Sequence, residues 1–141
     1  NFNIAPTREM PLEGAELAMD WRPLPSQRLQ LNYAYLDIDG PRRGDDNIAF
    51  VPQHSGSLGW WQAYESGWQF TTTYVFYNDL RVRRFHFDRL DTRLAHRLRL
   101  SGRQQLELAA VMQWRLSDEP ELRRENGSDR HRGWFSLDWR Y

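Results

Sequence analysis

Charged side chains at alternate positions form the part of this chain best suited to chemistry. They lie in one short segment and comprise Arg89, Asp91, Arg93, Arg97 and Arg99. An arginine guanidinium holds carboxylate or phosphate groups through a rigid fork of donors. The row can therefore form a structural ladder with carboxylates such as Glu107 and Asp138. It can equally line a path for an anion, and the sequence is compatible with both.

The remaining polar residues contain no catalytic or metal-binding motif. The histidines are His54, His86, His96 and His131, and their spacing is not that of metal ligands. Cysteine is absent, so no thiolate can act as nucleophile or ligand. The motifs of serine hydrolases, zinc proteases and phosphate-binding loops are absent as well. We therefore expect no enzyme activity, no metal and no cofactor.

A second set of basic residues falls between the patterned segments, where loops are expected. The candidates for ligand contact are Arg42, Arg43, Arg81, Arg83, Arg84 and His86. The last long connection has the same character, with Arg123, Arg124, Arg130 and Arg132. These loops could contact anionic lipopolysaccharide, capture an anionic iron chelate, or simply be solvated. The 19 basic residues are balanced by 19 acidic ones, so no overall charge favours nucleic acid as a partner.

Seven segments alternate apolar and polar residues, which is the pattern of β-strands with two different faces. The predicted strands lie near residues 14–21, 28–37, 55–64, 68–77, 88–100, 104–115 and 133–141. A helix over 88–100 would scatter its arginines around the whole circumference. A strand instead places all of them on one face, opposite a mostly apolar row. The sequence therefore predicts an all-β fold of antiparallel strands.

The lengths of the segments and of their connections indicate a transmembrane barrel. Segments of about ten residues suit tilted strands that cross the hydrocarbon layer. Short and long connections alternate, and aromatic residues gather near strand ends, as in outer-membrane barrels. The strands of a soluble β-sandwich also alternate apolar and polar residues, but arginine-rich polar faces favour a barrel whose lumen contains water.

The strand count bears on whether the chain closes by itself. Lipid tolerates no open sheet edge, and bacterial barrels have even strand numbers. Seven is odd, so we expect the C-terminal part of a larger barrel, with residues 1–13 as an extracellular loop. The alternative is a small standalone barrel that binds or anchors, with residues 1–13 as an eighth strand. A third alternative is an outer-membrane phospholipase or protease, which would need a Ser/His or Asp/His pair at the rim.

The last predicted strand ends on an aromatic residue. Its apolar side consists of Phe135, Leu137, Trp139 and Tyr141. A terminal aromatic strand resembles the signal that the barrel-assembly machinery reads, and strand addition at an exposed edge is a sensible way to read it. We therefore predict these four residues as an assembly signal.

Motifs along residues 14–141 resemble those of TonB-dependent outer-membrane receptors in order and spacing. The resemblance rests on Gly14-Ala15-Glu16-Leu17, Trp21-Arg22-Pro23, the stretch Leu29 to Asp37, Pro52-Gln53-His54 before Ser57-Leu58, Gly67-Trp68-Gln69-Phe70, Leu90 to Leu98, and the terminal strand. The stretch 113–118 departs from the family motif and keeps only Leu116 and Asp118. The family's plug domain and its TonB-binding box are not in this sequence.

The resemblance implies a barrel of about 22 strands, filled by an N-terminal plug domain. Such a receptor lies in the outer membrane of a Gram-negative bacterium. It takes up a scarce nutrient such as a ferric siderophore or cobalamin, driven by the TonB complex and the proton-motive force. The implied partners are outer-membrane lipid and lipopolysaccharide, the plug domain of the same receptor, the TonB complex and the barrel-assembly machinery.

Overall fold

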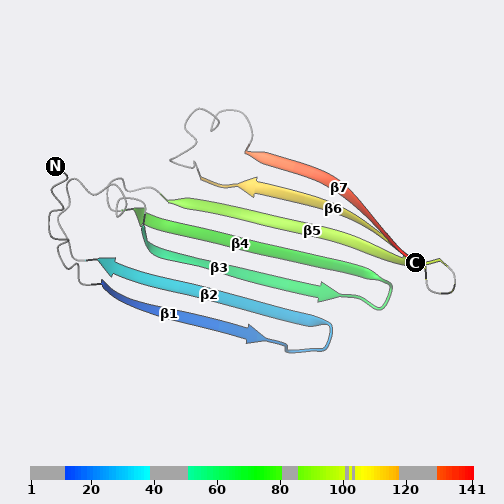
Figure 1. The fold of residues 1–141 in the computed structure, drawn as a ribbon, viewed down its shortest axis with the longest axis horizontal. Helices are drawn as coiled ribbons and strands as arrows, with labels where there is room; N and C mark the ends of the chain where they lie inside the picture. Colours follow the sequence, from blue (N-terminus) through cyan, green and yellow to red (C-terminus); the bar gives the residue numbers. More distant parts are fainter. Residues whose placement is uncertain (1–11, 39–50, 81–85, 101, 103, 118–129) are drawn as a thin grey trace, which may run out of the picture.

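A computed structural model describes residues 12–38, 51–80, 86–100, 102, 104–117 and 130–141. These residues form one antiparallel sheet whose seven strands follow the order of the sequence (Figure 1). The strands are β1 (Leu12–Trp21), β2 (Gln27–Ile38), β3 (Pro52–Ala63), β4 (Trp68–Leu80), β5 (Phe87–Arg99), β6 (Gln105–Arg115) and β7 (His131–Arg140). The predicted all-β fold of antiparallel strands is confirmed. The sheet is open, with β1 and β7 as its two edges.

The register of each pair brings the two apolar rows onto the same side. In the β5–β6 pair, for example, Leu90 is opposite Trp114, and the alternating pattern repeats along both strands. Arg97 is opposite Glu107, on the other side. Because directly opposite residues point to the same face of a sheet, an apolar face and a polar face run through all seven strands.

The connections after β1, β3 and β5 are short and lie at the same end as the C-terminus (Figure 1). We call this the turn end and the opposite one the loop end. The turn between β3 and β4 requires glycine at Gly67, where φ is +87°. A Cβ there would lie 2.6 Å from the carbonyl oxygen of Arg97. The carbonyl oxygen of Gly67 also accepts the N–H of Arg97 at 2.9 Å, which fastens this turn to β5.

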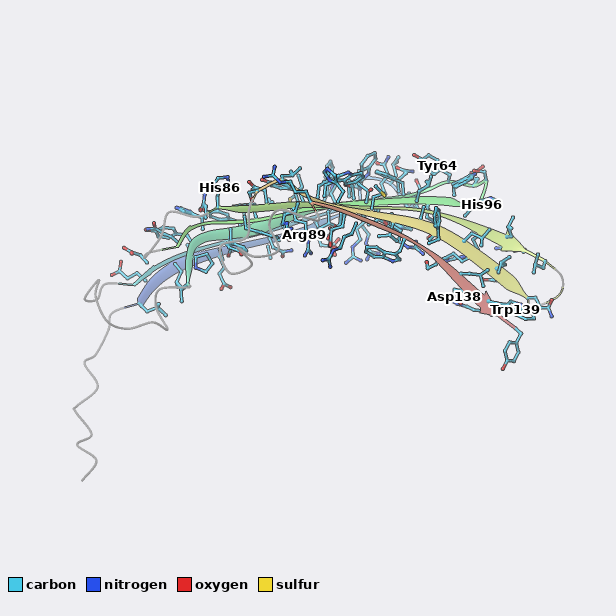
Figure 2. The ribbon with its side chains drawn as sticks, turned by 90° about the horizontal axis from the view of Figure 1, so that it is seen from above. Tyr64, His86, Arg89, His96, Asp138 and Trp139 are labelled. Carbon is cyan, nitrogen blue, oxygen red and sulfur yellow. The ribbon has the colours of Figure 1, made fainter. Side chains whose placement is uncertain are left out.

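The sheet is bowed, and its two faces differ in curvature (Figure 2). Arg89 lies on the concave side, whereas Tyr64 and His96 lie on the convex side. The polar face is therefore the inner face of the bow and the apolar face is the outer one. A soluble sheet that encloses its own core would place the apolar residues inside the bow.

Few side chains are buried. Among the described residues the buried hydrophobic ones are Phe87, Ala95 and Ala109. All three belong to the polar rows of β5 and β6, and the ring of Phe87 stacks on that of Tyr77 in β4. No helix in the described part of the chain is long and apolar enough to cross a membrane.

Several predicted strand bounds need correction. Residues 12 and 13 belong to β1 and not to a loop, and β3 begins at Pro52, three residues earlier than predicted. Proline is tolerated there because it is the first residue of the strand, where an N–H to the ladder is dispensable. β4 continues to Leu80, and β7 begins at His131, so that Arg132 is a strand residue. The rest of the predicted loop 1–13 lies outside the described residues.

Candidate functional site

The apolar face carries large side chains that no described residue covers. On β7, Phe135 is 89% exposed and Leu137 is 67% exposed. The exposed set on this face also includes Leu17, Met19, Trp21, Leu58, Trp60, Tyr64, Trp68, Leu94, Leu108, Met112 and Trp139. Exposed apolar patches of this extent mark contact with another protein or with a membrane. The face is therefore a contact surface that needs an apolar partner.

Aromatic residues and histidine meet at the turn end of the apolar face. The rings of Trp68 and His96 stack with their centroids 4.4 Å apart. His96 Nε2 lies 3.2 Å from the carbonyl oxygen of Ser66 in the adjoining turn. His96 thus ties β5 to the β3–β4 turn through one polar contact and one ring contact.

The loop end of the apolar face has its own polar contacts. The hydroxyl of Tyr33 lies 2.8 Å from Nδ1 of His54 in the neighbouring strand. The hydroxyl of Tyr74 donates to Asp88 at 2.6 Å. The N–H of Asp88 donates to the hydroxyl of Ser117 at 2.5 Å, so these contacts link β4, β5 and the end of β6. Both ends of the apolar face therefore combine aromatic rings with polar groups, whereas its middle consists of aliphatic and aromatic side chains.

Glu107 organises the charged residues in the turn-end half of the polar face. It accepts from Arg93 at 2.5 Å through one oxygen and from Arg97 at 2.9 Å through the other. The side chain of Glu107 is only 15% exposed, while both arginines are partly exposed. Ala95 and Ala109 are paired with each other and buried, and Ala95 lies on the same face between Arg93 and Arg97. We call the three charged residues the Glu107 ladder.

The ladder meets a second ion pair on β7. Asp138 lies directly opposite Glu107, and Arg140 donates to Asp138 at 3.1 Å. Two facing carboxylates repel each other unless cations compensate them. Arg97 donates to Glu107 and Arg140 donates to Asp138, so a cation compensates each of the two carboxylates.

The other strands carry fewer charges on the polar face. Between β1 and β2, Arg28 donates to Asp20 at 2.5 Å. Over residues 53–63 and 69–77 the polar rows of β3 and β4 carry no charged side chain and consist largely of small or hydroxyl side chains. They include Ser55, Ser57, Gly59, Thr71 and Thr73. Positive charge on the polar face is thus concentrated on β5–β7.

The structure places the whole predicted charged row on one face of β5. Arg89 and Asp91 form an ion pair at 3.1 Å, and Arg93 and Arg97 share Glu107, one of the two carboxylates that the sequence offered as ladder partners. Arg99 occupies the same face near the turn end, and it has no acidic partner among the described residues. Of the predicted ligand-contact residues, His86 is exposed and lies on the convex side (Figure 2). The others, Arg42, Arg43, Arg81, Arg83 and Arg84, lie outside the described residues.

The predicted assembly residues lie along the free edge of the sheet. Phe135, Leu137 and Trp139 are opposite Ala110, Leu108 and Leu106 of β6. Every residue of β7 is exposed, because its other edge has no neighbour among the described strands. The geometry is that of an edge open to strand addition.

Some contacts had no signal in the sequence. The pairing of Tyr33 with His54 and the direct opposition of Arg89 and Arg115 depend on cross-strand register.

Within the described residues, no group of three or more histidine or acidic side chains could hold a metal ion. Comparisons of the chain with protein families, curated proteins and solved structures give no match.

Proposed function

We propose that the chain is part of the wall of an outer-membrane β-barrel that acts as a TonB-dependent receptor for a scarce nutrient such as a ferric siderophore. The observation that carries the wall assignment is the placement of the faces. The apolar face is convex and exposed, and the polar face with its ion pairs is concave. A barrel in lipid needs its apolar side outside and its polar side toward the lumen.

The direction of the edge strands supports a larger barrel. All neighbours are antiparallel, and the strand number is odd, so β1 and β7 run in the same direction. Pairing them with each other would be parallel, whereas bacterial outer-membrane barrels close antiparallel. An odd number of further strands removes the conflict. We infer that the missing strands belong to the same receptor, together with the plug domain that couples it to the TonB complex.

The terminal strand adds a role in assembly. β7 presents an open edge with an unbroken apolar row. Strand addition uses such an edge for main-chain hydrogen bonds and the alternate side chains for specificity. We infer that the barrel-assembly machinery recognises Phe135, Leu137, Trp139 and Tyr141. Lipid and lipopolysaccharide then cover the same row in the finished barrel.

The first test concerns the two faces. These 141 residues contain no cysteine, so single cysteines can carry spin labels without a background from this segment. Leu58→Cys and Ser57→Cys are neighbours in β3 on opposite faces and outside the ion pairs. In the full-length protein in lipid bilayers, we expect the label at 58 to respond to oxygen dissolved in the lipid. We expect the label at 57 to respond to a water-soluble nickel complex. The reverse pattern would overturn the wall assignment.

The receptor function needs a separate test. Deletion of the gene should abolish growth on the cognate ferric siderophore under iron limitation, and collapse of the proton gradient should stop uptake. The coding sequence upstream of Asn1 should encode a plug domain. A signal peptide directly before Asn1 would instead support the small standalone barrel and reject the receptor proposal.

A further inference from the structure

A tryptophan and an arginine stand two residues apart on the concave face of β7. Among the exposed aromatic side chains of the described strands, Trp134 alone belongs to a polar row, and it is 49% exposed. Arg132 is exposed on the same face, two residues nearer to the loop end. Residues two apart are separated by about 7 Å along a strand. The two positions therefore present an aromatic ring and a guanidinium group on one face.

The neighbouring strand completes a patch with an apolar half and a polar half. In β6, Val111 is directly opposite Trp134, and Gln113 is directly opposite Arg132. Directly opposite residues point to the same face of the sheet. We call these four residues the Trp134 patch. Trp134 and Val111 form its apolar half, and the hydrogen-bond donors of Arg132 and Gln113 form its polar half.

The two main groups of the patch have no partner in the described part of the chain. Arg132 forms no ion pair and no side-chain hydrogen bond with a described residue, and the indole of Trp134 stacks on no described ring. Asp91 is paired with Gln113 from the other side, but it bridges to Arg89 instead, at 3.1 Å. Both the ring and the guanidinium are therefore free to contact a ligand.

The chemistry of the two groups narrows what can bind. An aromatic ring favours contact with a second ring, in an offset or an edge arrangement. A guanidinium fork matches the two oxygens of a carboxylate. Binding sites for small molecules combine apolar surface with a few polar groups that fix the orientation of the ligand. A molecule that satisfies both halves of the patch has an aromatic ring and an acid group a few bonds apart.

We propose that the Trp134 patch binds the aromatic acid unit of a small water-soluble ligand. The ring lies against Trp134 and Val111, and the carboxylate lies at Arg132. The inference rests on the proposed function, because the barrel lumen gives a solute access to the concave face, and it narrows the nutrient to one that carries such a unit. A strand added beside β7 in a larger barrel pairs with the main chain of β7, so its polar face still points to the lumen.

Binding can be measured on the purified full-length protein in uncharged detergent at low salt. Benzoate is the probe, and saturation-transfer NMR of its ring protons is the readout. Two related molecules separate the contributions of ring and charge. Benzyl alcohol has the ring without the charge, and cyclohexanecarboxylate has the charge without the aromatic ring. We expect benzoate to bind, and each of the other two to bind about threefold more weakly or worse.

Variants assign the binding to the patch. Trp134→Leu keeps an apolar side chain but removes the ring, and it should weaken benzoate binding about fivefold. Trp134→Phe retains a ring and should keep the affinity within about twofold. Arg132→Gln removes the charge and should weaken binding about tenfold. This last variant decides the question if Trp134→Leu folds poorly, because Arg132 loses no side-chain contact with the described residues.

Two matched controls lie outside the patch. Trp139→Leu changes an exposed tryptophan on the apolar face of the same strand. Arg99→Gln removes an exposed arginine that also has no acidic partner among the described residues, on the same face near the turn end. Each control should change the affinity for benzoate by less than about twofold, since neither side chain reaches the patch and distant exposed charges are screened.

Three outcomes would overturn the proposal. The first is absence of benzoate binding to the unaltered protein, as expected if another part of the protein covers the patch. The second is equal affinity for benzoate and cyclohexanecarboxylate. The third is an affinity that Arg132→Gln lowers no more than Arg99→Gln does.

The spin-label experiment keeps the two proposals apart. Lipid exposure of the label at 58 without benzoate binding rejects the aromatic acid site and retains the barrel wall. Benzoate binding that depends on Arg132, with the label at 58 in water, rejects the wall and retains the site.

Discussion

At the turn end of the polar face Glu107 lies between Arg93 and Arg97, whereas at the loop end Asp91 shares its rows with four arginines. Both regions are built from the same strands and the same residue types. They differ in how many carboxylates the register delivers. In the first region one carboxylate bridges two arginines, so that it connects β5 to β6. In the second region Asp91 bridges to Arg89 of its own strand.

The ladder should contribute more to stability than any other polar group on this face. Glu107→Gln leaves two partly buried guanidinium groups without their carboxylate. We expect the free energy of unfolding to fall by about 2 kcal/mol, because hydrogen bonds to charged groups contribute more than neutral ones. Urea titration followed by tryptophan fluorescence measures it. Glu16→Gln in β1 is the control, since exposed Glu16 has no ion pair among the described residues, and its loss should stay below about 0.5 kcal/mol. Equal effects would remove the distinction between ladder and surface charge.

The ion pair of Arg89 and Asp91 at the loop end should respond differently to the loss of its carboxylate. Asp91→Asn removes the partner of Arg89 in a partly exposed ion pair, and we expect a loss of about 1 kcal/mol at low salt. High salt should reduce that loss, because screening weakens the interaction between partly exposed charges. The same urea titration at low and at high salt checks this. A loss that salt leaves unchanged would mean that Asp91 acts through packing alone.

The smallest effect is expected at the outer ion pair of β7. Arg140 and Asp138 are both largely exposed, with side-chain exposures of 65% and 52%. Arg140→Gln should change the free energy of unfolding by less than about 0.5 kcal/mol, as is common for exposed ion pairs. The midpoint of urea unfolding is the measurement, and Arg28→Gln on β2 is the parallel case. A loss as large as that of Glu107→Gln would show that the ladder extends as one unit onto β7.

Alternation along the chain was sufficient to predict all seven strands and the side on which each residue lies. The bounds were less predictable, because Pro52, His54 and His131 belong to residue types that are also common in loops. The register between neighbouring strands was harder to predict than the strand bounds. The side of Arg115 follows from its own strand, but its neighbours Arg89 and Arg130 follow only from how β5, β6 and β7 are aligned. The sequence therefore identified the arginine row of one strand but not which arginines of β6 and β7 lie beside it.

The role of glycine at Gly67 was also hidden. Gly67 was noted only as part of a motif that resembles one of TonB-dependent receptors, whereas its positive φ and the close approach of the Arg97 carbonyl are properties of the folded turn. By contrast, the ladder partner Glu107 could be anticipated, because a row of arginines on one strand needs carboxylates on the next. Charge requirements are thus visible in sequence, and close backbone approaches are not.

The two open edges have a practical consequence for anyone who handles this segment. β1 and β7 contain no proline, and most of their charged residues lie on the polar face, so the apolar side of each edge has little that discourages strand pairing. Each edge is a ten-residue template with an apolar side. A fragment released by proteolysis or expressed alone should therefore associate edge to edge into insoluble material. Its yield in soluble form would rise only when another strand occupies each edge as the chain folds.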